Sequence, residues 1–375
     1  MKPLNTFTSE LLRKVSKSDT YNGLNSDQVF LSILRNPLAW YSEPIIYLKR
    51  GNDSIRSIIG VEKDQKYASF IDFFDGQGNY KISQYLEQAY KSSLPNQFEK
   101  DFIETDRKVN LLFSALEGEI LKIFPVPNDL NNKWISTSEV PSENYETVDA
   151  LFATNIIPLY IKELDNSIVS NNYENAEKIL ESIKGFQVKY GKEILPSEDK
   201  IKAEILYNKY DIFKKLFLYY FLVGLVFFLF IIFQIFTTNI KINHVFKYLF
   251  KGFRSIIFLL FIVHTFGLIA RGYISGHAPW SDAYESMIYV AWATMGIGLL
   301  FARKSDLTLA STSFVTSMIL MIAHWNWMDP SIANLVPVLD SYWLMIHVSV
   351  IVGSYGPFTL AMILGIVALI LMILT

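Results

Sequence analysis

The sequence predicts a mainly α protein in two parts: a helical extracytoplasmic domain, residues 1–211, followed by a polytopic α-helical membrane domain, residues 212–375. The first observation is the charge distribution, because residues 1–211 hold 31 of the 36 acidic residues and 25 of the 34 lysines and arginines. The second is a series of long apolar runs after residue 211, since a helix needs about 20 apolar residues to cross a bilayer. Length and charge together therefore indicate one soluble and one membrane domain.

The soluble part shows helical periodicity in six stretches, which are residues 7–17, 25–35, 80–93, 99–124, 143–170 and 173–190. Asn25 or Ser26 is a suitable helix N-cap, and Gly191 is a suitable stop. The segment PIIYLKR predicts a short strand. After Pro196 the pattern continues into the first apolar run, which predicts one helix leading into the membrane. Nucleotide loops, metal-ligand spacings and catalytic triads are absent from this part of the sequence, so we expect it to bind or position a partner.

Five apolar runs are candidate membrane spans, namely Leu216–Phe236, Ser255–Gly272, Tyr284–Phe301, Leu307–Ala323 and Trp343–Leu374. The loop after the first run contains four basic residues and no acid, and the loop after the third run contains ARKSD. The other two loops contain acids and no basic residue. By the positive-inside rule, the basic loops face the cytoplasm, and the acidic loops and residues 1–211 face outside.

Export of a large N-terminal domain raises a question about the ends of the chain. The start, MKPLNTFTSELLRKV, has no apolar region of a signal peptide, and the final apolar run ends without a polar flank. We therefore expect the chain to be part of a longer protein with further membrane segments on both sides. The alternative is a complete protein with an unusual start.

Cysteine is absent from the sequence. This excludes disulfides, iron–sulfur clusters, thiolate zinc sites and a thiol nucleophile in this chain. A basic patch with interleaved aromatic residues is also absent, which argues against nucleic acid as a partner.

All five histidines lie in the membrane part, at 244, 264, 277, 324 and 347. His347 shares a helix face with Trp343 and lies near the outer boundary, where an imidazole could bind haem iron; the alternative is a histidine hydrogen-bonded inside the bundle. His264 lies within a span, with Arg271 on the same face, and Arg271 could pair with a carboxylate such as a haem propionate. The alternative is a packed histidine with an arginine reaching the interface.

The stretch ISGHAPWSDAYES, residues 274–286, joins two apolar runs. His277 and His324 lie in outer loops and are interpreted mainly as solvated, and His244 has no predicted role. Trp280 belongs to a group of four tryptophans at the outer boundary, with Trp325, Trp327 and Trp343. This group fits an interfacial aromatic belt, but it is dense enough to stack on a flat ligand. Asp282 and Glu285 are interpreted as caps of the helix that follows.

Two long motifs, RGYISGHAPWSDAYESMIYVAW and LVPVLDSYWLMIHVSVIVGSYG, closely resemble the CcsA (ResC) family of cytochrome c biogenesis proteins. The order of domains is similar to that of fused CcsBA proteins of system II, with residues 1–211 resembling the exocytoplasmic region before the CcsA part. The resemblance implies that haem b crosses the membrane as a substrate and is presented at the outer face. There its vinyl groups react with the two thiols of an apocytochrome Cys-X-X-Cys-His motif.

By this resemblance His347 is an axial ligand of the haem iron, and Trp343, His264, Arg271, His277 and Trp280 are candidate haem-site residues. The resemblance implies as further partners a CcsB/ResB-like portion fused upstream and a thiol-reducing protein. It also implies a Trp-rich WWD loop and a second histidine after Thr375, so cytochrome c synthase activity is expected of the complete protein or complex. His277 is expected to be structural or gating.

Two other functions stay open from the residues. One is a membrane receptor whose outer domain senses a ligand, which predicts a cytoplasmic output domain. The other is a haem- or quinone-bearing electron-transfer subunit, which predicts paired histidines facing each other within the spans.

Overall fold

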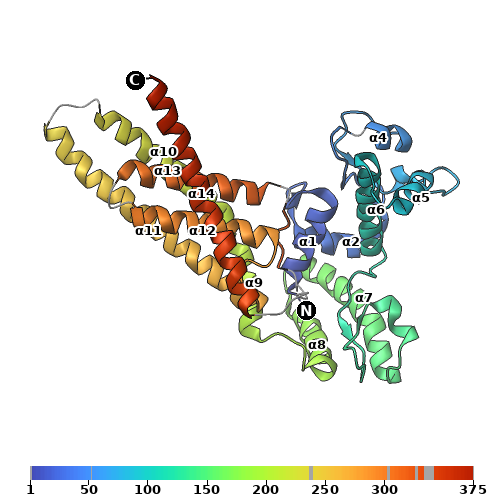
Figure 1. The fold of residues 1–375 in the computed structure, drawn as a ribbon. Coiled ribbons are helices and arrows are strands. Elements are labelled where there is room, and N and C mark those ends of the chain that lie inside the picture. The colour runs from blue at the N-terminus through green and yellow to red at the C-terminus, as the bar shows by residue number, and fades with distance from the viewer. Residues whose placement is uncertain are drawn as a thin grey trace. The chain divides into compact units, whose positions relative to one another are not determined.

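The computed structural model describes residues 2–51, 53–235, 240–301, 305–325, 328–332 and 342–374 (Figure 1). Contacts divide the chain into two compact units, Met1–Ser197 and Glu198–Thr375. The described residues are mostly helical, with three two-stranded antiparallel ribbons, which confirms the mainly α prediction. The predicted domain boundary at residue 211 refers to the membrane surface, which these contacts do not locate, so it stays a prediction.

The first part of unit 1 contains the helices α1 to α6 and two β-ribbons. Its elements are α1 (Leu4–Ser16), β1 (Thr20–Tyr21), β2 (Leu24–Asn25), α2 (Ser26–Arg35), α3 (Pro37–Trp40), β3 (Ile46–Tyr47), α4 (Asp53–Ile59), β4 (Tyr67–Ala68), η1 (Ile71–Phe73), α5 (Ser83–Lys91) and α6 (Gln97–Leu116). Asn25 caps α2 in a reciprocal capping box with Gln28, as predicted. The predicted strand is also confirmed, because β3 pairs with β4 and places Ile46 opposite Ala68.

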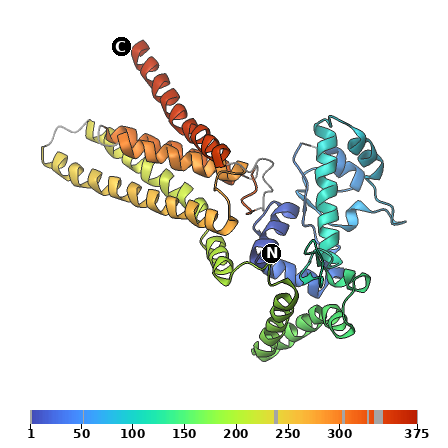
Figure 2. The same cartoon turned by 60° about the horizontal axis from the view of Figure 1, so that its bottom comes forward.

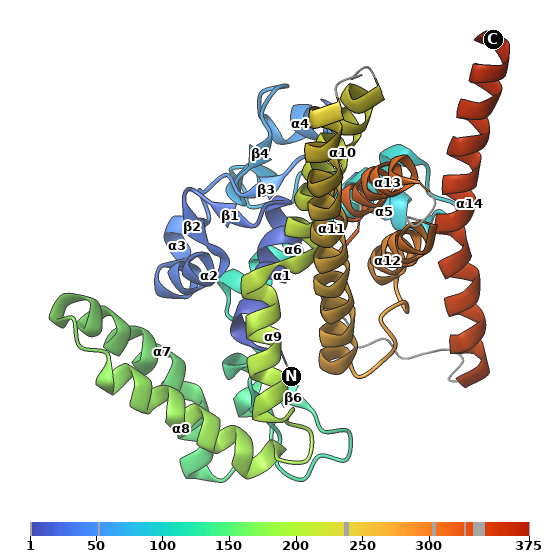
Figure 3. The same ribbon diagram turned by 90° about the vertical axis from the view of Figure 1, so that its left-hand side faces the viewer.

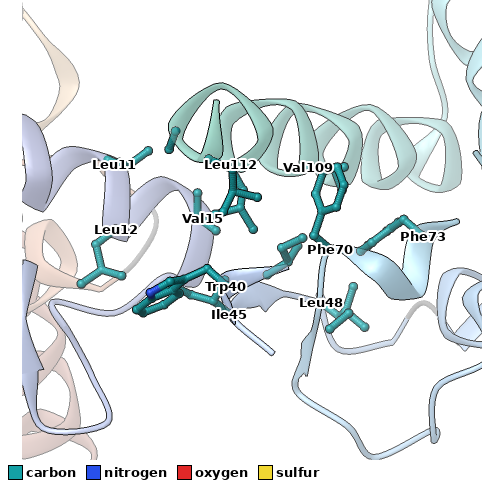
Figure 4. Close-up of a cluster of buried hydrophobic side chains, with 14 of the residues drawn as sticks. Leu11, Leu12, Val15, Trp40, Ile45, Leu48, Phe70, Phe73, Val109 and Leu112 are labelled. Carbon is teal, nitrogen blue, oxygen red and sulfur yellow. The ribbon is translucent and has the colours of Figure 1, made fainter. Parts of the chain in front are cut away.

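Apolar side chains from these elements meet in one core beneath α6 (Figure 4). Its buried members include Leu11, Leu12, Val15, Trp40, Ile45, Leu48, Phe70, Phe73, Val109 and Leu112. Burying each large apolar side chain contributes about 1.5–3 kcal/mol. This core explains why short strands that would be unstable alone are held in place.

The second part of unit 1 is a ribbon packed on a helical hairpin. Its elements are β5 (Phe124–Pro125), β6 (Trp134–Ile135), η2 (Thr137–Ser142), α7 (Thr147–Ser170) and α8 (Glu174–Gly191). The predicted helix over 99–124 was too long, because α6 ends at Leu116 and Gly118 adopts a positive φ of 72°. Gly191 ends α8 as predicted. A Cβ there would lie 2.7 Å from the Trp134 ring, so close packing also requires glycine.

Unit 2 consists of six helices, as far as it is described. They are α9 (Glu198–Tyr210), α10 (Ile212–Ile235), α11 (Ile240–Ser275), α12 (Ala283–Phe301), α13 (Asp306–His324) and α14 (Tyr342–Leu374), shown from two further directions in Figures 2 and 3. The predicted continuous helix into the first span is interrupted at Asp211, whose φ is 41°. Among the described residues four segments are long and apolar enough to cross a membrane: Glu198–Gln234, Val245–Ser275, Ala283–Phe301 and Asp306–His324. They contain the second, third and fourth predicted spans and the first as far as Gln234, since Phe236 lies outside the described residues; the fifth predicted span lies in the helix α14.

Small residues allow the helices of unit 2 to approach closely. A Cβ on Gly224 of α10 would lie 3.1 Å from the Phe314 amide nitrogen in α13, and a Cβ on Gly298 of α12 would overlap Thr312 of α13. Gly353 and Gly356 of α14 face Tyr289 and Thr294 of α12. α14 thus crosses α12 over residues 289–294.

Candidate functional site

Most of the predicted site residues lie near one end of unit 2, where α11 and α13 end and α12 and α14 begin. The α11–α12 connection, residues 276–282, and the segment after α13, residues 328–332, both contact Arg271 near the C-terminal end of α11. His347 lies six residues before Gly353, which packs on Tyr289. Figures 1 and 3 show that α14 begins at the end of unit 2 where α11 ends, and His347 is the sixth residue of α14. His347 therefore belongs to the same end of the bundle as residues 276–282.

Arg271 is completely buried and lies at the centre of a polar cluster. Its Nε–H donates to Glu285 Oε1 at 2.8 Å, and Glu285 is also completely buried. Other guanidinium N–H groups face the carbonyl oxygens of Pro330 at 2.9 Å and Ser331 at 3.1 Å. Two longer contacts, each 3.5 Å, reach the Tyr207 hydroxyl and Asp282 Oδ2. We name this set the Arg271 cluster: Arg271, Glu285, Asp282, Tyr207 and the carbonyls of Pro330 and Ser331.

The Arg271 cluster also fixes the start of α12. Asp282 Oδ1 accepts the Glu285 amide hydrogen at 2.7 Å, which is the predicted N-cap bond. Glu285 Oε2 accepts the Ser281 amide hydrogen at 2.9 Å. His277 Nδ1 lies 3.7 Å from the same Glu285 oxygen and 3.1 Å from the Ala278 carbonyl oxygen. The two carboxylates thus hold the loop, the helix start and Arg271 together.

Trp280 leads from this loop into a ladder of aromatic rings. Its ring centre lies 4.9 Å from that of Tyr289, which lies 5.7 Å from Trp292, and Trp292 stacks on Phe261 at 5.6 Å. The Trp292 Nε1–H donates to Thr265 Oγ1 at 2.9 Å. All four rings of the ladder are partly exposed, so it forms a partly exposed aromatic strip along α11 and α12.

His264 is completely buried between α10, α11 and α12. Its Nε2 lies 3.0 Å from the Ile288 carbonyl oxygen, so this nitrogen carries the hydrogen and donates it. The Phe213 and Tyr220 rings lie 5.4 and 6.1 Å from the imidazole. In this arrangement His264 acts as a packing residue that joins α11 to α12.

His347 and Trp343 lie one turn apart on α14, and both side chains are exposed. Gly356, nine residues after His347, faces α12, which places His347 on the opposite side of α14. His347 is therefore an accessible imidazole beside an accessible indole. Trp327, Asp340 and the side chain of His244 lie outside the described residues.

Sequence reasoning missed two members of the Arg271 cluster. It expected a carboxylate partner for Arg271 but interpreted Glu285 as a helix cap, and it gave Tyr207 no role. The available signal was that Arg271 and Glu285 are opposite charges at the adjoining ends of two successive apolar helices. The main-chain acceptors at Pro330 and Ser331 carry no such signal, since any residue type supplies a carbonyl.

Residues 280–374 match the family model of the cytochrome C assembly protein. The Cytochrome c biogenesis protein CcsA of Synechococcus sp. is 34% identical over 123 residues, which is 32% of this chain and 38% of that protein. This segment is of the CcsA type. The CcsA-type segment thus contains Trp280, Glu285 and the whole of α14 with His347.

Protein NrfI of Wolinella succinogenes is similar to the entire chain, including the part before the CcsA-type segment. The two are 36% identical over 382 residues, covering 100% of this chain and 40% of that protein. CcsA of Prochlorococcus marinus is 35% identical over 106 residues, covering 27% of this chain and 34% of that protein. The chain thus spans about two fifths or less of the length of these relatives.

Proposed function

We propose that this chain takes part in cytochrome c maturation by handling haem b as a substrate and delivering it for covalent attachment to an apocytochrome c. The observation that carries the proposal is the CcsA-type segment, in which His347 is exposed at the loop end of the bundle. Similarity to CcsA and to NrfI over the rest of the chain supports it.

In this proposal His347 donates its imidazole lone pair to the haem iron, and Trp343 covers part of the porphyrin face. The exposed position on α14 suits this role, because a ligand histidine must present a ring nitrogen to a planar group without displacing helix packing. Trp280 and His277 belong to the loop between α11 and α12, at the same end of unit 2 as His347, and His264 packs inside the bundle. Their contribution is to shape and support the site.

The reaction itself joins the haem vinyl groups to the two thiols of a Cys-X-X-Cys-His motif in the apocytochrome. Holding the haem in a fixed orientation at the membrane surface raises the effective concentration of the reacting groups. We propose that the thiols come from the apocytochrome, kept reduced by a thiol-reducing partner, and that a CcsB/ResB-like portion completes the site. Residues 1–211 then face the periplasm of a bacterium, with the helices α10 to α14 in its cytoplasmic membrane.

The test is a visible spectrum of the full-length protein, purified in detergent from haem-replete cells. We expect six-coordinate haem in the wild type, loss of that signature in His347→Ala, and its recovery on addition of imidazole. The matched control is His277→Ala, which removes a histidine from the neighbouring loop and should retain the wild-type spectrum.

Equal haem content and identical spectra in wild type and His347→Ala would remove His347 as the ligand. A wild-type protein without haem would contradict the haem-handling function itself.

A further inference from the structure

Two loops at the site end of unit 2 are joined by one buried ion pair. Arg271 on α11 bonds Glu285 in the first turn of α12, and the same guanidinium faces the Pro330 and Ser331 carbonyls after α13. Residues 276–282 precede α12, and residues 328–332 lie in the connection that leads to α14, which carries His347. A single side chain therefore links both connections of the candidate haem site.

The guanidinium has no capacity left for an external ligand. Its three nitrogens contact five oxygens, and the whole residue is 0% exposed. The Tyr284 ring lies 5.0 Å from its central carbon and closes one face of the group. A haem propionate could reach Arg271 only after the Arg271 cluster had opened.

The pair is also poorly replaceable. Glu285 is 0% exposed, so an unpaired Glu285 or Arg271 would be a buried charge without compensation, which strongly destabilises the folded state. Arginine is required rather than lysine because a planar guanidinium reaches Glu285 and both carbonyls at once, whereas an ammonium offers a single point charge.

We propose that Arg271 is a positioning residue: it clamps residues 276–282 and 328–332 together through Glu285 and so fixes the rim of the haem site without touching haem. Only the identification of the adjoining site as a haem site rests on the proposed function. The clamp itself is a property of unit 2 and can be measured without any ligand.

The absence of cysteine from the sequence makes a direct test possible. Ser331 is 9% exposed, and its carbonyl accepts from Arg271, so Ser331→Cys places a protected thiol beside the clamp in an otherwise cysteine-free chain. We measure the rate at which a maleimide modifies this thiol in the full-length protein in detergent.

We expect slow modification in the otherwise wild-type protein and a rate at least about tenfold higher when Arg271→Gln is added, because a broken buried pair favours local opening. Glu285→Gln should raise the rate similarly. The double variant should be no faster than either single variant, because both remove the same interaction. Arg271→Lys should give an intermediate rate.

The matched control is Arg254→Gln. Arg254 lies on the same helix and pairs with Asp306 at 2.6 Å, but this pair is partly exposed and lies 17 residues before Arg271 along α11. This variant should leave Ser331→Cys as slow as in the wild-type background. A variant that had lost its fold altogether would also show a high rate of maleimide modification. Such a variant is recognised by a lower melting temperature and by loss of its near-ultraviolet circular dichroism spectrum.

A second measurement, the haem content of each variant, distinguishes a positioning role of Arg271 from direct contact with haem. If Arg271 bound a propionate, Arg271→Gln would reduce haem content while Glu285→Gln would not, and this result would overturn the proposal. Unchanged thiol protection in both variants would overturn it as well. If the wild type held no haem but the thiol rates behaved as expected, the clamp would stand and the proposed function would fall.

Discussion

At the scale of single residues, Asp282 makes two contacts at the start of α12. Its Oδ1 caps α12 by accepting the Glu285 amide hydrogen, and its Oδ2 lies 3.5 Å from Arg271. Burial raises the pKa of the Asp282 carboxyl above its ordinary value of 3.8, and the nearby Glu285 carboxylate acts in the same direction. The cap bond and Arg271 only partly offset this effect.

This shift predicts a pH dependence of stability. The folded chain holds the Asp282 proton more tightly than the unfolded chain, so protonation of Asp282 stabilises the fold as the pH falls through its raised pKa. The gain levels off below 3.8. We expect Asp282→Asn, which keeps a capping oxygen, to remove this contribution.

The measurement compares melting temperatures of the full-length wild type and Asp282→Asn between pH 7 and pH 4. As the pH falls, the melting temperature of the wild type should rise relative to that of Asp282→Asn. A difference that is constant with pH would show that Asp282 titrates at the same pH in the folded and unfolded chains.

At the scale of elements, the position of α14 depends on two glycines. Gly353 and Gly356 lie on its α12-facing side, and a Cβ on Gly356 would overlap Thr294 and lie 3.1 Å from the Val290 carbonyl oxygen. The Thr294 hydroxyl donates to that same carbonyl at 2.7 Å, so this side chain is held in place. Because α14 carries His347, its contact with α12 sets where the imidazole lies.

We expect Gly356→Ala to destabilise unit 2 by about 1–3 kcal/mol, since overpacking forces α14 away from α12. Gly365→Ala is the matched control on the same helix, because a Cβ there meets no atom within 4 Å. Alanine favours the helix, so the control should be neutral or slightly stabilising. Melting temperatures in detergent test both, and equal effects would contradict the close α12–α14 approach.

The helix boundaries predicted from the sequence agree with the structure where a local signal exists, and they differ from it where tertiary contacts determine the boundary. The capping box at Asn25 was predicted correctly, because a cap residue acts on its own chain neighbours. α8 also ends at Gly191 as predicted, at a position where the Trp134 ring leaves no room for a Cβ. The end of α6 was missed, since amphipathic periodicity continues to residue 124 while Phe124 pairs with Ile135 in a ribbon. The break at Asp211 was missed because its signal is a single backbone conformation.

At the scale of the whole molecule, charge distribution predicts a sidedness. Residues 1–211 and the loop at 276–282 are expected on one side of the membrane, and the basic segment around Lys247 on the other. The four apolar segments of unit 2 require such an alternation, whichever side the first one starts from.

Single cysteines in the cysteine-free chain test this sidedness. Ser182→Cys in unit 1 and Ser281→Cys in the loop replace exposed serines, and Lys247→Cys replaces an exposed lysine. In intact cells with a permeabilised outer membrane, a membrane-impermeant maleimide should modify the first two. It should modify the third only after the inner membrane is disrupted. Modification of Lys247→Cys alone would invert the proposed orientation.

The sequence by itself determined the helical class, the apolar segments, most helix positions and the CcsA-type motifs, because periodicity, hydropathy and caps are properties of neighbouring residues. Tertiary structure decided which charges meet. Arg271 contacts Glu285 fourteen residues later, Tyr207 on α9 and the carbonyls of Pro330 and Ser331. Similarly, α14 packs on α12 through Gly353 and Gly356. These contacts join elements that local pattern treats as independent, and only packing brings them within bonding distance.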